Sequence, residues 1–397
     1  MSKVIAVNSG SSSLKFQLFQ MPEEVVLTSG QAERIGQEMG VFTINVNGEK
    51  IVTETPIKDH QVAVDLLLES LVKHGIVKDL NEIEGAGHRI VQGGSYFSES
   101  VVVDEDVVSK VDELCSLAPL HNHAHLVCYE AFKKALPQIG HIFVFDTAFH
   151  QTMPPESYLY PVPYEWYEDL KVRKYGAHGT SHQFVMNRLG ELMHKDPKDM
   201  NIITCHLGNG ASITAIKNGK CYNTSMGLSP LGGIMMGTRS GDIDPTVVYY
   251  VEQKLGLSAK DMETELNKKS GMLGVSGVSS DSRDVEAAFK EGNPRAILTQ
   301  YLYAQRVVDF IGSYYMELGH VDAIAFTAGL GEHAVDMRER VLKRLEEGMG
   351  VRVDYELNAK THKEEKLSTP DSKVEVWVVP TNEELVIARD TVRLLGL

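Results

Sequence analysis

The stretch VIAVNSGSSSLKFQLF, residues 4–19, places two apolar runs on either side of a turn made of small residues. Apolar runs of this length around a glycine-containing turn predict two β-strands joined as a hairpin. Hairpins commonly turn on two residues such as Asn-Gly, but here Asn8, Gly10, four serines and Lys15 stand together. Glycine lets the backbone approach a ligand closely, and N–H groups and hydroxyls in such a turn form an anion-binding nest. The turn therefore predicts a cradle for phosphate groups.

A second hairpin of the same kind lies in the middle of the chain. NIITCHLGNGASITAIKNGKCYN, residues 201–223, is again an apolar strand, a glycine-rich turn and a second strand. The pair Asn218-Gly219 follows, as Asn47-Gly48 stands within FTINVNGEKIVTET, residues 42–55, and each pair predicts a hairpin. The order strand, small-residue turn, strand, Asn-Gly, strand thus occurs twice, which indicates two related halves. The alternative, that α/β proteins often open with hairpins, stays open.

The order of the predicted elements suggests the fold class and the domain boundary. Helical patterns separate further short apolar runs, and strands that alternate with helices predict an α/β layer fold. The proline-rich segment QTMPPESYLYPVPYEWYEDL, residues 151–170, is the best candidate for a crossing between domains. We therefore expect one domain over residues 1–150 and a second over residues 151–383. The closing helix, residues 384–397, is expected to pack back on the first domain.

Composition excludes several classes of protein. The 397 residues suggest two or three domains at roughly 100–200 residues each. The 39 basic and 54 acidic residues leave a net charge of -15, which argues against a nucleic-acid partner. No apolar run approaches the roughly 20 residues of a membrane span, and MSKVIAVNSG at the N-terminus lacks the pattern of a signal peptide. The four cysteines show no Cys-x-x-Cys spacing, so we expect a cytoplasmic protein with reduced thiols and no membrane partner.

Three glycine-rich turns point to a nucleotide. Besides the two hairpin turns, residues 8–13 and 207–212, the segment Thr327–Gly331 follows a predicted strand. Three turns with exposed N–H groups suit the phosphates and the nucleoside of a triphosphate. No G-x-x-x-x-G-K-[ST] sequence occurs, so the chain is not a P-loop protein. GLGEHA, residues 329–334, also fits G-x-G-x-x-A, and a dehydrogenase that binds NAD is therefore an alternative.

Several side chains near these turns are suited to chemistry on phosphate or carboxylate groups. Arg89 lies in GAGHRIVQGG and Arg239 in MMGTRSGDIDP, and a guanidinium offers a planar fork of fixed charge that matches both groups. His178 lies in YGAHGTSH, and Asp146 ends the run HIFVFD, where a strand would open on a cleft. Glu383 opens the last predicted helix, where it serves either the helix dipole or magnesium.

Two other kinds of site were weighed. The histidines His121, His123 and His125 in LHNHAHL could hold zinc, although no second cluster completes such a site. The alternative is the start of a helix with Asn122 as its cap. No G-x-S-x-G sequence occurs, so a serine hydrolase has little support.

The quoted segments, in this order, resemble the acetate kinase family, within the superfamily of sugar kinases, actin and heat-shock chaperone ATPases. The resemblance runs from VNSGSSSLKF through GHRIVQGG, APLHN, FDTAFH, YGAHGTSH and HLGNGASITAI, and on through TSMGLSPLGGIMMGTRSGDIDP, SGVSSDSRD and FTAGLGE to VPTNEELVIARDT. It covers essentially the whole chain. It implies two duplicated ribonuclease-H-like (actin-like ATPase) domains, each with a mixed sheet flanked by helices, an active-site cleft between them, and a homodimer. It also implies phosphoryl transfer from ATP to acetate with magnesium, or with manganese as an alternative.

The resemblance implies roles for individual residues. Arg89 and Arg239 would hold the carboxylate and the migrating phosphoryl group, and His178 would donate to that group. Asp146 and Glu383 would position magnesium and the second arginine, Arg239. The acyl substrate would contact Arg89, Val91, Leu120, His121, Ala177 and Pro230, and the metal would lie at Asn8 and Glu383. The nucleotide and its phosphates would contact Asn8, Ser11, Ser13, Lys15, His206, Gly208, Asn209, Gly210, Asp281, Arg283, Gly329 and Gly331.

The physical chemistry agrees with this assignment. Acetate is already a carboxylate nucleophile and needs no general base, so catalysis depends on alignment and on neutralising charge on the phosphoryl oxygens. The sequence departs from the family where Ala177 replaces a usual Phe, which predicts a larger acyl pocket and use of propionate or longer acids. Further departures are Gln92, His123, Gly232 and His333. A propionate or butyrate kinase and a non-enzymatic nucleotide-binding chaperone or scaffold therefore stay as alternatives beside the dehydrogenase.

Overall fold

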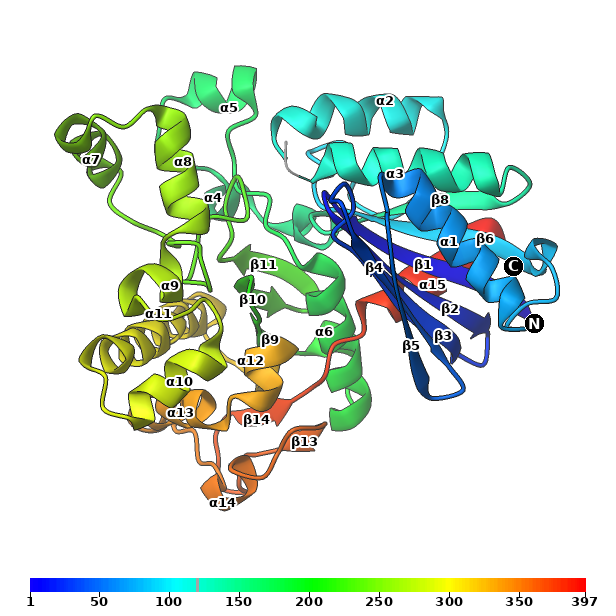
Figure 1. Cartoon of the computed structure of the whole chain (residues 1–397). Helices are drawn as coiled ribbons and strands as arrows, with labels where there is room; N and C mark the ends of the chain where they lie inside the picture. The colour runs from blue at the N-terminus through cyan, green and yellow to red at the C-terminus, as the bar shows by residue number, and fades with distance from the viewer. Residues whose placement is uncertain (119–120) are drawn as a thin grey trace. The chain divides into compact units, whose positions relative to one another are not determined.

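The computed structural model describes residues 1–118 and 121–397, and the chain divides into two compact units. Unit 1 consists of Met1–Phe149 and Asn382–Leu397, and unit 2 consists of His150–Thr381. Each unit contains one mixed sheet with helices on its faces (Figure 1). The predicted α/β class is confirmed. Among the described residues, no helix combines the length and apolar character required to cross a membrane.

The sheet of unit 1 has eight strands in the order β5-β4-β3-β2-β1-β6-β8-β7. Strands β1 to β5 pair antiparallel along the chain, whereas β1, β6 and β8 are parallel to one another. Their bounds are β1 (Ser2–Gly10), β2 (Ser13–Met21), β3 (Val25–Glu33), β4 (Gly40–Val46), β5 (Glu49–Thr55), β6 (Ile83–Ile90), β7 (Val101–Val102) and β8 (Gly140–Phe145). The carboxyl ends of β6 and β8 therefore lie at the same edge of the sheet, next to the β1–β2 turn.

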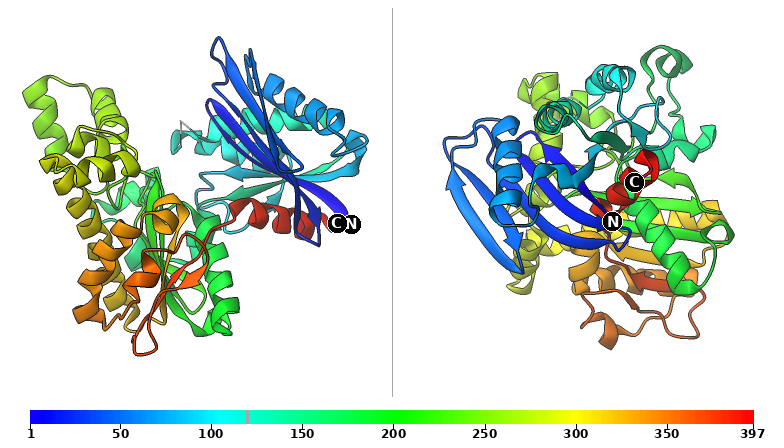
Figure 2. Two further views of the ribbon diagram at one scale, coloured as in Figure 1. Left: turned by 60° about the horizontal axis from the view of Figure 1, so that its bottom comes forward. Right: turned by 90° about the vertical axis from the view of Figure 1, so that its right-hand side faces the viewer.

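Helices cover both faces of this sheet (Figure 2). The helices α1 (His60–Lys73) and α3 (Asn122–Ala135) pack on one face, where alternate residues of β1, Ile5 and Val7, enter a shared apolar core. The helix α2 (Glu105–Glu113) packs beside α3. The C-terminal helix α15 (Glu383–Leu395) contacts β1, β6 and β8, as predicted for a helix that returns to the first half of the chain.

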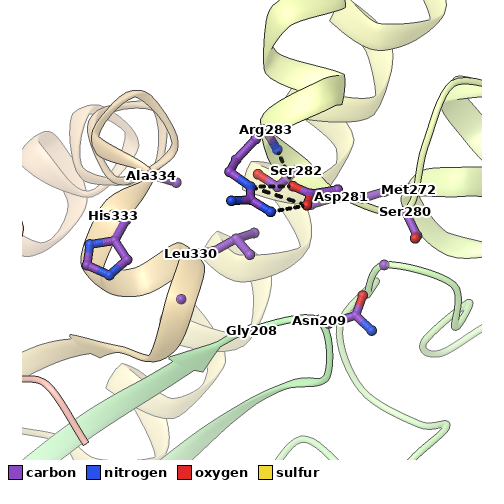
Figure 3. Close-up of a pocket in the computed structure, with 12 residues that line it drawn as sticks. Gly208, Asn209, Met272, Ser280, Asp281, Ser282, Arg283, Leu330, His333 and Ala334 are labelled. Atoms are coloured by element: carbon purple, nitrogen blue, oxygen red, sulfur yellow. Dashed lines mark hydrogen bonds and ion pairs between the residues drawn. The ribbon is translucent and has the colours of Figure 1, made fainter. Parts of the chain in front are cut away.

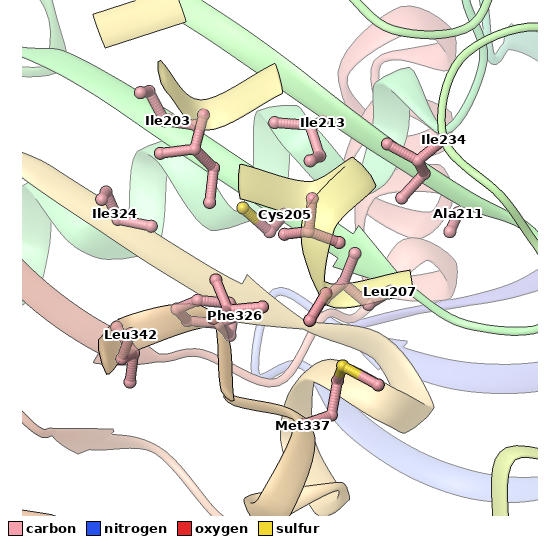
Figure 4. Packing of buried hydrophobic residues seen from close by; sticks show 14 of the residues in the cluster. Ile203, Cys205, Leu207, Ala211, Ile213, Ile234, Ile324, Phe326, Met337 and Leu342 are labelled. Carbon is pink, nitrogen blue, oxygen red and sulfur yellow. The ribbon is translucent and has the colours of Figure 1, made fainter. Parts of the chain in front are cut away.

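Unit 2 has a six-stranded sheet in the order β11-β10-β9-β12-β14-β13. Its strands are β9 (Asn201–Leu207), β10 (Ala211–Lys217), β11 (Lys220–Thr224), β12 (Ala323–Thr327), β13 (Glu365–Lys366) and β14 (Glu375–Val378). The helix α6 (Gly179–Met193) packs on β9, and α11 (Pro294–Leu318) packs on β9, β10 and α13 (Val335–Met349). Figure 4 shows Ile203, Cys205 and Leu207 of β9 packed with Phe326 and Met337.

Shorter helices complete unit 2. The proline-rich segment predicted as a crossing forms α4 (Pro155–Tyr158) and α5 (Tyr164–Leu170) at the start of this unit. The other helices are α7 (Thr246–Leu255), α8 (Ala259–Lys268), α9 (Gly271–Ser276), α10 (Ser282–Lys290), α12 (Ala328–His333) and α14 (Tyr355–Asn358).

The two sheets repeat one strand order. The series β3-β2-β1-β6-β8 in unit 1 matches β11-β10-β9-β12-β14 in unit 2, with the first strand of each half in the centre. The predicted match of the Asn-Gly turns is wrong. Asn218-Gly219 joins β10 to β11, whereas Asn47-Gly48 joins β4 to β5, an extra hairpin that extends only the first sheet. The counterpart turn in unit 1 is Pro22–Glu24, because spacing along the chain does not identify which strands pair.

The glycines of β6 and β8 allow α15 to pack closely on the sheet. A Cβ atom on Gly87 would lie 2.4 Å from Ile387 and 2.5 Å from Thr391. Cβ atoms on Gly85 and Gly140 would likewise meet side chains of α15 at 2.8 Å and 2.5 Å. These distances are too short for non-bonded atoms, so any side chain there displaces the helix that begins at Glu383.

We expect Gly87→Ala to destabilise the protein by roughly 1–3 kcal/mol, because the added methyl overpacks the contact with α15. The matched control is Gly312→Ala in α11, where a Cβ meets nothing within 4 Å. Since alanine is the better helix former, this control should be neutral or up to about 1 kcal/mol stabilising. Urea unfolding followed by circular dichroism measures both changes, and equal midpoints for the two variants would contradict the packing argument.

Candidate active site

Arg89 and Asp146 form a buried ion pair at the carboxyl edge of the unit 1 sheet. Arg89 is on β6, and Asp146 follows the last residue of β8. Arg89 Nε and Nη2 donate to the two oxygens of Asp146 at 2.9 Å and 2.6 Å. The third arm, Nη1, donates to Asn8 Oδ1 at 3.0 Å. The Asp146 side chain is fully buried and that of Arg89 is 19% exposed, so the guanidinium is fixed in position with one edge open.

The surrounding carboxylates keep Arg89 charged. Burial alone lowers the pKa of its guanidinium, but the charge and hydrogen bonds of Asp146, with the charges of Glu383 and Glu384, raise that pKa above its usual value. Glu383 and Glu384 begin α15, which the glycines of β6 hold against this edge. Arg89 is therefore a permanent cation that links Asn8, Asp146 and the start of α15.

The serine-rich turn is tighter than its sequence suggests. β1 and β2 pair as far as Gly10 opposite Ser13, so only Ser11 and Ser12 form the turn. Asn8 lies opposite Lys15 in this ladder. Ser11 and Lys15 are exposed and Ser13 is half-buried, which leaves polar groups of the hairpin available to an anionic ligand.

His178 occupies the start of α6 in an unusual backbone conformation. Its φ of 58° is left-handed, which is uncommon for a residue other than glycine. Its Nδ1 lies 2.8 Å from Ser212 Oγ, and its ring stacks on that of His206 with the centroids 4.1 Å apart. These contacts fix both the ring plane and the direction in which Nε2 points.

Arg239 lies beside His178, across the glycine of the second hairpin turn. A Cβ atom on Gly210 would lie 2.6 Å from Arg239 Nη2 and 3.5 Å from His178 Nε2. A side chain at residue 210 would therefore displace the Arg239 guanidinium, whereas the His178 ring would lie at ordinary van der Waals distance. Arg239 Nη1 donates to the Pro230 carbonyl at 2.7 Å, and burial lowers the pKa of its guanidinium. No carboxylate among the described residues forms an ion pair with Arg239.

A cavity of about 500 Å³ opens next to this turn. Figure 3 shows Asn209 on one side, Asp281 and Arg283 at the start of α10, and Leu330 and His333 of α12. Asp281 accepts hydrogen bonds from the backbone and side chain of Arg283, which lower the pKa of its carboxyl to about 2. The pair is therefore ionised at neutral pH. The mixed polar and apolar walls suit a nucleoside with its phosphates toward the turn.

The structure groups the predicted residues within each unit. Asn8, Arg89 and Asp146 meet in unit 1, and His178, Gly210, Pro230 and Arg239 meet in unit 2. Of the predicted nucleotide residues, Gly208, Asn209, Asp281, Arg283 and Gly329 line the cavity.

Other predicted residues lie elsewhere. Gly331 is the buried residue of α12, and His206 is 8% exposed and hydrogen-bonded to Ser181. Neither residue lines the cavity. Val91 is 5% exposed, and Ala177 is 2% exposed and packs in the apolar core of unit 2. Leu120 lies outside the described residues.

The His-rich segment starts helix α3, as the second expectation held, but the cap residue differs. His121, not Asn122, occupies the cap position of α3, and its side chain makes no capping bond. The side chain of Asn122 instead holds the backbone of Gln92, accepting from its N–H at 3.1 Å and donating to its carbonyl at 2.9 Å. Within the described part of the chain, no group of three or more His, Cys, Asp or Glu side chains is arranged to bind a metal. The zinc alternative therefore has no structural support.

Sequence reasoning also missed residues that the structure places in the site. Met272, Ser280, Ser282 and Leu330 line the cavity, and His333, noted only as a departure from the family, lines it too. The segment SGVSSDSRD carried a signal for the serines, since it was part of the resemblance. Nothing in the sequence marked Ser212 as the partner of His178, because a serine on a strand beside a glycine turn is common.

Comparisons with known proteins give a consistent result. The sequence model of the Acetokinase family matches residues 3–389. The acetate kinase of Bacillus subtilis is 55% identical over 394 residues, which cover 99% of this chain and all of the relative. The crystal structure of Porphyromonas gingivalis acetate kinase superposes with a TM-score of 0.95 at 46% identity and full coverage of both chains. That of a propionate kinase from Francisella tularensis gives 0.94 at 38% identity, covering 99% of this chain and all of the other.

We expect Asp146→Asn to destabilise the protein by roughly 3 kcal/mol, because it leaves the Arg89 cation partly buried without its counter-ion. The control is Asp106→Asn, which breaks the exposed pair with Lys110 and should leave the unfolding midpoint close to that of the wild type. Urea titrations at neutral pH measure both. If Asp146→Asn lost no more unfolding free energy than the control, the buried ion pair would not stabilise this edge of the unit 1 sheet.

Proposed function

Because the chain belongs to the acetokinase family and is therefore a kinase, we propose that it transfers the γ-phosphoryl group of ATP directly to acetate. The products are acetyl phosphate and ADP. The observation that carries the proposal is the meeting of Arg239 and His178 at Gly210, beside a cavity of about 500 Å³ suited to a nucleotide. Because the chain belongs to this family, we no longer interpret it as a dehydrogenase or as a non-enzymatic nucleotide-binding chaperone.

The reaction needs positioning and charge, and no covalent residue. An oxygen of the acetate carboxylate attacks the γ-phosphorus as the bond to the bridging oxygen breaks, and ADP leaves with the electron pair of that bond. Negative charge is then spread over three equatorial oxygens. A cation without a carboxylate partner stabilises that charge more than an ion-paired one, and Arg239 is such a cation.

Each predicted catalytic residue receives a role from its contacts. Arg239 and His178 would act on the migrating phosphoryl group, and Arg89 would hold the carboxylate or a phosphate oxygen through its exposed edge. Asp146 was expected to position the second arginine, Arg239. Its two oxygens instead hold Arg89 in the same unit, so we assign it the positioning of Arg89.

Magnesium, with manganese as an alternative, is the metal that we propose. Magnesium in kinases is held by one or two protein oxygens together with substrate phosphates, and the absence of a preformed cluster among the described residues fits that mode. Asn8 and Glu383 are the candidates, because both offer oxygen ligands and both lie near Arg89 at the carboxyl edge of the unit 1 sheet. The metal would neutralise phosphate charge when ATP binds.

The chain is also proposed to form a homodimer. The helix α7 buries none of its side chains and exposes Val247, Tyr249, Tyr250 and Leu255. Apolar and aromatic side chains gathered on one exposed helix favour a partner. The cytoplasmic location stays a prediction from the sequence.

We expect Arg239→Ala to lower kcat by about 10³- to 10⁵-fold while changing nucleotide affinity much less, because the guanidinium acts mainly on transition-state charge. Turnover is measured by a coupled assay, and ADP affinity by calorimetry. The control Arg306→Ala removes a half-exposed arginine of the same unit and should leave both values near wild type. Equal losses of affinity and rate in Arg239→Ala would count against the assigned role.

The substrate itself is tested with an acid series. ATP and magnesium are supplied with acetate, propionate or butyrate, and the acyl phosphate is trapped as a hydroxamate. No hydroxamate from acetate would refute the proposed function. We predict relaxed chain-length preference relative to Ala177→Phe, with a methylene worth about 1–3 kcal/mol in kcat/KM.

The buried position of Ala177 requires a stability control. Inserting a ring into the core of unit 2 is expected to cost about 1–3 kcal/mol, so the assays are run well below the unfolding temperature of the variant. If the natural chain prefers acetate as strictly as Ala177→Phe, residue 177 does not set chain length and the alternative of a propionate kinase loses its support.

A further inference from the structure

The sheet of unit 2 carries a polar face beneath α6. In the β9–β10 ladder Thr204 lies opposite Thr214 and His206 lies opposite Ser212. Their neighbours Ile203, Cys205 and Ile213 point to the other face and join the apolar core (Figure 4). All four polar residues are buried, with Thr204, Ser212 and Thr214 at 0% exposure. Buried hydroxyls need hydrogen-bond partners. Residues at the start of α6 supply them for Thr204, His206 and Ser212, and Thr224 of β11 supplies one for Thr214.

A continuous chain of hydrogen bonds runs along this face to His178. Thr204 Oγ1 lies 2.7 Å from His182 Nδ1, and His182 Nε2 lies 2.8 Å from Ser212 Oγ. Ser212 Oγ in turn lies 2.8 Å from His178 Nδ1. Burial, with the charges of His150 and His206, lowers the pKa of His182 well below its usual value. His182 is therefore neutral at pH 7 and carries one ring hydrogen.

The donors in this chain permit one fully satisfied direction. If Thr204 donates to His182 Nδ1, then His182 donates from Nε2 to Ser212, and Ser212 donates to His178 Nδ1. The hydrogens of Thr204, His182 and Ser212 then each have an acceptor within the chain, and the remaining hydrogen of His178 is on Nε2. In the reverse direction the Thr204 hydroxyl hydrogen has none, because the described residues offer Oγ1 no contact other than His182. A buried donor without an acceptor is costly, so the first direction is favoured.

The backbone before His178 is held by a second histidine. His150 Nε2 donates to the Ala177 carbonyl at 2.8 Å, while the thiol of Cys221 lies 3.1 Å from His150 Nδ1. Gly176, with a φ of 80°, allows this approach, since a Cβ there would lie 2.6 Å from the His150 ring. The His178 ring is therefore held by its backbone, by its stacking on His206 and by Ser212, and it cannot exchange its two nitrogens by a simple flip.

We propose that Ser212, backed by His182 and Thr204, is a positioning residue that fixes His178 with its hydrogen on Nε2. In this tautomer Nε2 donates toward the same space as Arg239 Nη2, the space that a Cβ on Gly210 would fill. The opposite tautomer would present a lone pair to the anionic phosphoryl oxygens. The inference rests on the proposed function for its kinetic consequence, but the tautomer itself is a property of the protein without substrate.

The tautomer is tested by ¹⁵N NMR of the full-length protein labelled at histidine. The His178 signals are assigned by their absence from His178→Gln. We expect an N–H resonance at Nε2 and a lone-pair resonance at Nδ1 in the natural protein. We also expect mixed or averaged signals in Ser212→Ala and in Thr204→Val. The control Thr214→Val removes a buried hydroxyl bonded to Thr224 on the same face, and it should leave the His178 signals unchanged.

Kinetics provide the second measurement. Ser212→Ala should lower kcat about 10- to 100-fold with the KM for ATP and for acetate within about twofold, because a misdirected donor affects alignment more than binding. Thr204→Val should give a smaller loss, and Thr214→Val should stay within about twofold of wild type. Wild-type protein with the hydrogen on Nδ1, or Ser212→Ala with unchanged kcat, would overturn the proposal. If no acyl phosphate forms from any acid, the proposed function fails, while the NMR result still decides the tautomer.

Discussion

A guanidinium keeps its charge at neutral pH, and the two candidate catalytic arginines, Arg89 and Arg239, are held by different acceptors. Arg89 gives two of its three arms to the carboxylate of Asp146. Arg239 is held by the Pro230 carbonyl, with no ion pair to a described carboxylate. The charge of Arg89 is thus balanced by Asp146 and its position is fixed, whereas no described carboxylate balances the charge of Arg239. A dianionic phosphoryl group gains most from the second arrangement, because its own charge completes the pair.

The repeated strand order explains how each unit presents such a group. In both sheets the central strand forms a hairpin with its chain neighbour and pairs in parallel with a later strand. The hairpin turn and the carboxyl ends of the parallel strands therefore lie at one edge. Unit 1 uses a two-residue serine turn with Arg89 and Asp146 beside it, whereas unit 2 uses the turn 208–210, whose Gly210 leaves room for the Arg239 guanidinium beside His178.

Sequence patterns predicted the hairpins, the α/β class and the return of α15, since each depends on local periodicity. They failed where pairing is not local. The Asn-Gly turns looked equivalent although they join different strands, and the turn expected at Thr327–Gly331 continues into helix α12. Arg89, Arg239 and His178 stood out through their glycine neighbours. Ser212 and His182 did not stand out in the sequence. Their contact depends on the register between β9 and β10 and on the face of the sheet that α6 covers.

The same chain of hydrogen bonds bears on whether a side chain of the protein forms a covalent bond to the phosphoryl group during transfer. A histidine with its hydrogen on Nε2 has no lone pair there to attack phosphorus, and its Nδ1 lone pair accepts the Ser212 hydroxyl. The buried thiols offer no alternative, because burial raises the pKa of Cys205 and Cys221. A donor at Nε2 and inert thiols are the arrangement expected for the proposed direct transfer, in which the attacking oxygen is that of the substrate carboxylate.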